Sequence, residues 1–336
     1  MPYNKTTPDG NFHRINIKSK ALAENMLGDA DHRDVLIYVP YGHDGKGLPL
    51  LVDLAGFTGS GLAHANWRNF GESLPHRLDR LIADGTLPPV VVAMPDGFTG
   101  LGGNQYVNSA AVGRWEDFLI QDMLPAIEGK IGCGGAGRRG VFGRSSGGYG
   151  AMYHALKYPD VWSAAGVHSA DMGFEWVFLP DMPKALRALA PHDMSFETFL
   201  KAFDKGPHYK GDDIHALMLL AMGASYAPDP EAYFGVSLPV DLHTCELDEA
   251  QWSAWKAYDP IVMLDEFGEN LKKLKGLWID CGDKDQFNMV YPARQMHNHL
   301  EKRGVQHIYE EFPDNHFSLD YRFDRSLPFL VNALNS

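Results

Sequence analysis

Eight short runs of apolar and β-branched residues recur along the chain, and segments with helical periodicity separate several of them. A continuous apolar run of this length is typical of a strand buried on both faces. The runs lie at residues 14–19, 34–40, 48–56, 88–97, 140–143, 164–170, 274–282 and 305–313. Because strands that alternate with helices form parallel sheets, the pattern predicts an α/β fold. We expect a mostly parallel sheet with helices on both faces.

Four of the intervening segments have clear helical signals. Residues 73–85 place leucines at 74, 78 and 81 on one face, and Gly85 closes the segment. Residues 291–304 end on Gly304 in the same way, and residues 114–128 and 149–158 are also predicted helices.

Between residues 171 and 263 the sequence contains no convincing strand. About 90 residues is far longer than an ordinary connection in such a fold, so we predict a helical cap inserted into a core of residues 1–170 and 264–336. Its large apolar residues have two interpretations, a lid over a pocket or the core of the cap itself. They are Met172, Trp176, Phe178, Met218, Met222, Trp252 and Trp255.

Composition narrows the classes of partner. The 336 residues carry a formal net charge of −13, which argues against nucleic acid or an anionic membrane as the main partner. No stretch approaches the length of a membrane span, and the three cysteines are scattered. The N-terminal residues lack a signal-peptide pattern. We therefore expect a cytoplasmic protein without a membrane span, and a homo-oligomer is possible.

The most informative motif is Gly143-Arg144-Ser145-Ser146-Gly147, between a predicted strand and a predicted helix. G-x-S-x-G in this context is the nucleophile elbow, a tight turn that exposes its serine. Registering the motif on Ser146 would place Arg144 where a glycine is needed, so Ser145 is the predicted nucleophile. The backbone N–H of Ser146 is a predicted oxyanion donor.

A serine needs a base and an oriented acid, which in this architecture follow it along the chain in the order acid, then histidine. His316 follows the last predicted strand and is the predicted base. Asp285 follows the preceding predicted strand and is the predicted acid, with Asp283 as the alternative. Asp280 lies inside that strand, and Asp314 is expected to shape the loop beside His316.

The second oxyanion donor is expected after the third predicted strand. There the backbone N–H of Phe57 is assigned, and Gly56 permits close approach. His168 is expected to pack in the core. Three other histidines match no metal-binding spacing, so we predict solvated or structural roles for them, no metal site and no cofactor. They are His297, His299 and His307.

These motifs resemble the α/β-hydrolase esterase family that includes esterase D, feruloyl esterases and mycolyltransferases. The resemblance rests on LAGFTG, VVAMPDG, GRSSGGYGAMYHALKYPDVW, GDKDQF and NHF. It implies ester hydrolysis or acyl transfer by a Ser–His–Asp triad, and by position it gives Ser145, His316 and Asp285. The chain departs from the family in having Ala55-Gly56 where His-Gly is usual, and in its longer cap.

The expected activity is that of a serine carboxylesterase acting on a small-molecule ester through an acyl-enzyme. The alternatives are an acyltransferase or a thioesterase of the S-formylglutathione hydrolase type with the same triad, and a non-catalytic binding protein on this fold. Arg144 could contact an anionic substrate group or form a structural salt bridge. The other substrate-binding candidates are Gly56, Trp176 and Phe287.

Overall fold

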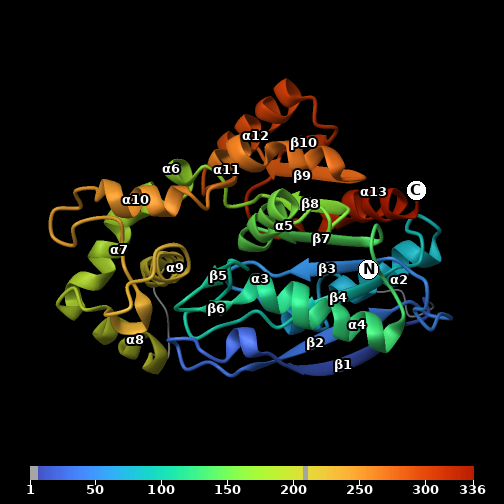
Figure 1. Cartoon of the computed structure of the whole chain (residues 1–336), viewed down its shortest axis with the longest axis horizontal. Coiled ribbons are helices and arrows are strands. Elements are labelled where there is room, and N and C mark those ends of the chain that lie inside the picture. Colours follow the sequence, from blue (N-terminus) through green and yellow to red (C-terminus); the bar gives the residue numbers. More distant parts are fainter. Residues whose placement is uncertain (1–6, 207–210) are drawn as a thin grey trace.

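A computed structural model describes residues 7–206 and 211–336 (Figure 1). Its main sheet has eight strands in the order β1-β2-β4-β3-β7-β8-β9-β10. The first two strands run antiparallel to their neighbours and the other six are parallel, so the predicted mostly parallel sheet is confirmed. The strands are β1 (Asn11–Lys18), β2 (His32–Val39), β3 (Leu50–Leu54), β4 (Val91–Pro95), β7 (Arg139–Arg144), β8 (Ala164–His168), β9 (Gly276–Gly282) and β10 (Ile308–Phe312).

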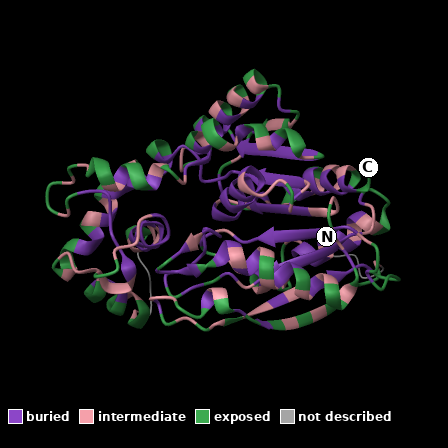
Figure 2. Cartoon of the chain, in the orientation of Figure 1, coloured by how far each residue is buried: buried purple, intermediate pink, exposed green. Residues whose placement is uncertain are grey.

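Helices cover both faces of the sheet. Successive side chains of a strand point to opposite faces, so an apolar strand makes both faces of the sheet apolar. In β4, Val91 and Ala93 belong to one apolar cluster, whereas Val92 and Met94 belong to the other. The central strands are accordingly buried throughout (Figure 2). Helices α2 (Leu74–Ala83) and α13 (Phe323–Asn335) pack on one face. The other face packs against α3 (Trp115–Asp117), α4 (Leu124–Ile131), α5 (Ser146–Lys157) and α12 (Val290–Arg303).

The helix ends follow local chemistry. Ser73 caps α2 by accepting a hydrogen bond from the backbone N–H of His76. Gly304 ends α12 in the left-handed conformation, with φ of 67°. Both boundaries lie within a residue or two of those predicted.

The predicted helix at 114–128 differs from expectation. It is interrupted by the π-helical turn η2 (Phe118–Met123), in which the N–H of Leu124 donates to the carbonyl of Leu119. Pro125 accounts for the change, because proline has no N–H and its ring crowds the carbonyl four residues earlier.

Residues 171–206 and 211–263 are mainly helical, as expected, and most of their helices form the group on the left of Figure 1. The helices are α6 (Phe174–Val177), α7 (Met182–Leu189), α8 (Phe196–Lys205), α9 (Gly211–Tyr226) and α10 (Glu249–Lys256). Most of the large apolar residues singled out here are buried and belong to the apolar cluster that also packs on the sheet. The division into core and cap stays a prediction.

The remaining elements are short or connect the larger ones. They are α1 (Gly61–Ala65), α11 (Pro260–Phe267), the two-residue strands β5 (Asn108–Ser109) and β6 (Gly113–Arg114), and the 3-10 helices η1 (Lys20–Leu22), η3 (Leu179–Asp181), η4 (Ala190–His192), η5 (Tyr233–Gly235), η6 (Gly268–Lys273) and η7 (Leu319–Arg322). Among the described residues, no helix has the length and apolar character needed to cross a membrane.

Candidate active site

Ser145 occupies a strained turn between β7 and α5. Its φ of 58° and ψ of −127° lie in a backbone region that residues other than glycine rarely adopt. The Ser145 backbone N–H is held by the carbonyls of His168 and Ser169, at 3.0 and 3.1 Å. The turn is therefore fixed by the end of β8 beside it, and it exposes the serine where the strand ends.

The flanking glycines allow the turn to approach its neighbours. A Cβ on Gly147 would lie 1.8 Å from the carbonyl oxygen of Leu54, and one on Gly143 would lie 2.4 Å from the same atom. Only glycine fits at such distances, so these two positions bring α5 directly against the end of β3.

His316 and Asp285 form a buried pair in the loops after β10 and β9. The two atoms His316 Nδ1 and Asp285 Oδ2 are 2.7 Å apart. Since a carboxylate accepts, Nδ1 carries the proton and Nε2 is left with a lone pair. The other Asp285 oxygen accepts from the backbone N–H of Phe287 at 2.9 Å. Asp283, the alternative acid, is exposed.

Ser145 and His316 line one cavity of about 690 Å³, including its opening to solvent. Gly56, Phe57 and Arg144 also line it, so it gathers most of the predicted site residues. The remaining wall is largely apolar and includes Val177, Ile214, Met218, Phe287, Met289 and Phe317.

The helical segment 171–263 contributes to this cavity through α6 and α9. Of the seven large apolar candidates, Met218 lines the cavity. Trp176 does not: its ring packs against Tyr291 and is 46% exposed, and its neighbour Val177 faces the cavity instead. Most of that apolar set therefore forms core rather than cavity wall.

Two further candidates have well-defined contacts. The Phe287 ring packs edge-on against His316, with 4.8 Å between ring centroids. Arg144 lies 3.7 Å from Asp320, which is the structural salt bridge considered for it. It also lines the cavity, and its contact with an anionic substrate group stays a prediction.

Asp171 was not predicted, yet it lies against both serines. Its two carboxylate oxygens accept from the Ser145 hydroxyl at 3.4 Å and the Ser146 hydroxyl at 2.9 Å. Complete burial raises the pKa of Asp171 to about 6, and the hydrogen bonds from the serines and the nearby His316 oppose that rise. Its position shortly after β8, at the carboxyl edge of the sheet, is the signal that could have identified it.

A second serine, histidine and aspartate form a chain of side-chain contacts elsewhere in the protein. Ser326 Oγ lies 3.0 Å from His168 Nε2, and His168 Nδ1 lies 2.7 Å from Asp280. All three are buried, and Arg322 also donates to Asp280 at 3.0 Å. None of the three serine, histidine and aspartate residues lines the cavity that contains Ser145. The group joins β8 and β9 to α13, which agrees with the core role predicted for His168.

Comparisons with known proteins show the family and the fold of the chain. The family model described as "Putative esterase" matches residues 30–328. No curated protein matches the chain. Among solved structures, a ferulic acid esterase superposes with a TM-score of 0.61 at 17% identity, covering 97% of this chain and 99% of that one.

Two other similar structures have related descriptions. An S-formylglutathione hydrolase from Staphylococcus aureus has a TM-score of 0.57 at 16% identity, covering 97% of this chain and 100% of that one. A ferulic acid esterase from Anaeromyces mucronatus has a TM-score of 0.58 at 14% identity, covering 99% and 93%. At these identities the likeness shows the fold, which is that of the α/β-hydrolase esterases.

Proposed function

We propose, from the premise that this chain belongs to the esterase family, that it is a serine carboxylesterase in which Ser145 is the nucleophile, His316 the base and Asp285 the acid that orients it. The observation that carries the proposal is that Ser145 and His316 line the same cavity, while the buried Asp285 holds His316 from behind. The Ser145 turn, strained and fixed by backbone hydrogen bonds, supports it.

The reaction follows from the donors and acceptors in the cavity. His316 Nε2 accepts the hydroxyl proton as Ser145 Oγ attacks the ester carbonyl, and Asp285 stabilises the resulting imidazolium. The backbone N–H groups of Ser146 and Phe57 are the proposed donors to the oxyanion. The imidazolium then protonates the leaving alcohol, and a water molecule, activated by the same histidine, releases the acid.

Asp171 adds a step before the attack on the ester. In the structure the Ser145 hydroxyl donates to Asp171, so the hydroxyl must turn from that carboxylate toward His316 before it attacks. We propose that Asp171 positions Ser145 in the resting enzyme, and that protonation of its carboxyl weakens this hold.

The cavity wall supports an ester with an apolar acyl or alcohol group. Seven of its residues present apolar side chains, of which Phe57, Phe287 and Phe317 are aromatic. A second hollow shares Phe57, Thr58 and Ile214 with the first, so the apolar surface extends beyond the reacting carbon. This surface favours substrates longer than an acetyl ester.

The first experiment measures hydrolysis of p-nitrophenyl esters from acetate to laurate by the wild type and by Ser145→Ala. We expect Ser145→Ala to lower kcat by about 10⁴-fold or more. Ser326→Ala is the matched control, since it removes a serine that also faces a histidine but lies in the core. A fluorophosphonate probe should label the wild type and Ser326→Ala, but not Ser145→Ala.

Equal turnover by wild type and Ser145→Ala would refute the assignment. No turnover and no labelling of the wild type would favour a binding protein on this fold. Ester products formed when alcohols are added would instead indicate the acyltransferase, and preference for thioesters the thioesterase.

A further inference from the structure

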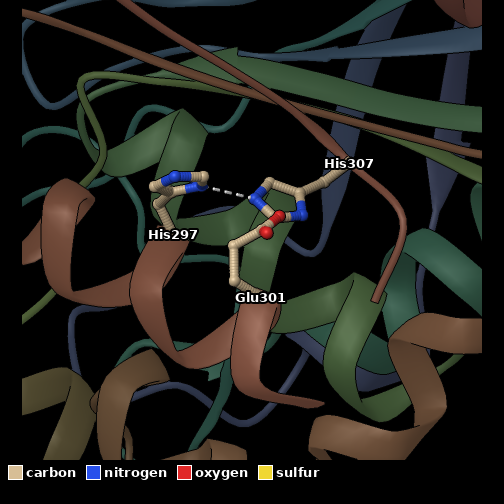
Figure 3. Close-up of side chains that lie close together, drawn as sticks. All are labelled: His297, Glu301 and His307. Atoms are coloured by element: carbon tan, nitrogen blue, oxygen red, sulfur yellow. Dashed lines mark hydrogen bonds between the residues drawn. The ribbon is translucent and has the colours of Figure 1, made fainter. Parts of the chain in front are cut away.

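A cluster of three metal-ligating side chains lies outside the candidate active site, on α12 and the segment before β10. His297 and Glu301 are one helical turn apart on α12, so they share a face, and His307 reaches them from the following segment (Figure 3). One potential ligand atom from each residue lies within 4.8 Å of the other two. None of the three lines the cavity that contains Ser145.

The hydrogen bonds of His307 fix the direction of its lone pair. Its Nδ1 lies 2.8 Å from the carbonyl oxygen of Val305, and because a carbonyl only accepts, Nδ1 carries the proton. The unprotonated Nε2 therefore faces His297 Nδ1, 2.8 Å away. A metal-bound histidine usually donates its other ring N–H to a carboxylate, a backbone carbonyl or water, as His307 does here.

The other two side chains are placed to complete such a site. The His297 ring stacks on Tyr309 with 4.5 Å between centroids and 10° between planes, which orients its Nδ1 toward His307. Glu301 is exposed, so its carboxylate can adjust to a ligand without disturbing the core. The positive charge of Arg294, on the same helix, is balanced by an ion pair with Glu311 at 2.6 Å.

We propose that His297 Nδ1, His307 Nε2 and the Glu301 carboxylate bind one divalent transition-metal ion of the zinc class, with water completing the coordination. The proton that His297 Nδ1 donates to His307 in the metal-free protein is lost to solvent on binding, and His297 Nε2 is protonated instead. Two imidazoles and a carboxylate suit such ions. At Zn–N distances of about 2.0–2.1 Å, the two nitrogens would be roughly 3.3 Å apart, so they need to separate by only about half an ångström.

The site would join the second half of α12 to the segment that enters the edge strand β10. Sequence spacing did not predict it, because the third ligand comes from a different element. The metal site lies away from Ser145 and His316, so we do not expect the ion to take part in ester hydrolysis. Met289, at the start of α12, lines the cavity, and His297 comes eight positions later, a rise of about 12 Å along the helix.

The test is calorimetric titration of the purified chain with Zn²⁺, beside Glu301→Gln, His307→Gln and His299→Gln. His299 is the matched control, since it lies on the same helix and outside the cluster. We expect one tight site in the wild type and in His299→Gln. Each cluster variant should weaken it at least about tenfold, because even changes to outer-shell partners cost 10–100-fold.

A second readout uses Co²⁺, whose visible absorption reports coordination by nitrogen ligands at a site of low coordination number. The wild type and His299→Gln should give the same spectrum, and His307→Gln should lose it. Equal Zn²⁺ affinity in all four proteins would overturn the proposal, as would the absence of any tight site in the wild type. In the latter case the contact is a simple histidine–histidine hydrogen bond. Because Glu301 is exposed, loss of binding in Glu301→Gln cannot be attributed to misfolding.

Discussion

Asp171 is a buried carboxyl whose ionisation opposes folding. Its pKa is about 6 in the folded protein and 3.8 in its ordinary state, so the folded protein holds the proton more tightly. The resulting loss of stability develops between about pH 4 and pH 6 and is constant above that range. We expect Asp171→Asn to become more stable than the wild type as the pH rises through this window, by up to about 3 kcal/mol.

Urea unfolding at several pH values between 4 and 8 measures the difference between the two proteins. The asparagine can still accept from Ser146, and its amide can donate to Ser145, so the geometry is retained. Asp283→Asn, an exposed change in the loop before Asp285, should show no such pH-dependent difference. A difference for Asp171→Asn that does not vary with pH would contradict the prediction.

The proposed active-site residues differ in how far sequence predicts them. Ser145, Asp285 and His316 follow from a motif and from chain order, because each must stand in a loop at the carboxyl edge of the sheet. Asp171 follows from no motif, since its partners are two hydroxyls whose direction depends on the folded turn. Trp176 was a candidate on composition alone, and a one-residue difference in helical phase places Val177 at the cavity instead.

At the scale of elements, α5 and β3 meet through Gly147. We expect Gly147→Ala to destabilise the protein by about 3 kcal/mol or more, because the new Cβ would lie 1.8 Å from the Leu54 carbonyl oxygen. Gly129→Ala is the control within α4, where a new Cβ has no atom within 4 Å. That change should be neutral or stabilising, by up to about 1 kcal/mol.

Thermal or urea unfolding of the two variants tests this pair. Equal stability of both variants would show that α5 can move away from β3 at little cost.

Helix α9 presents Met218 to the cavity and places Met222, one turn later, in the core. We expect Met218→Trp to narrow the cavity and lower kcat/KM for the longest p-nitrophenyl esters by about tenfold or more, with little change for the acetate. Met222→Leu, a volume-conserving change beside it, should leave the chain-length profile unchanged. A similar loss for all chain lengths would mean that Met218 affects catalysis rather than substrate length.

The strands and most helices of the sheet were predicted because each carries its own periodicity and its own end signal. The π-helical turn at Phe118–Met123 was missed because the apolar pattern of a helix persists through it, and only Pro125 marks the irregularity. The arrangement of α6 to α10 depends on contacts between distant segments, so sequence indicated their helical character but not which of their residues reach Ser145.

At the scale of the whole molecule, two histidine–aspartate pairs with the same 2.7 Å contact occupy different environments. In the first pair His316 lines the cavity, whereas His168–Asp280 is enclosed with Ser326 and Arg322. The His168, Trp278 and Arg322 contacts keep the pKa of Asp280 below its usual value against the effect of burial, so this carboxylate stabilises the fold while ionised. That contribution is present above pH 4 and is lost as Asp280 is protonated at lower pH.

The same substitution at the two aspartates should therefore give opposite results. Asp280→Asn leaves Arg322 less compensated in the interior, and we expect a loss of about 3 kcal/mol of stability with near-normal turnover by the folded protein. Asp285→Asn should lower kcat by about 10⁴-fold with little loss of stability, because the wrong histidine tautomer is favoured. Unfolding curves and ester hydrolysis measured on both variants separate the two roles. If Asp280→Asn abolished turnover in a fully folded protein, the enclosed group would be part of the catalytic apparatus, and the assignment of Ser145 would have to be reconsidered.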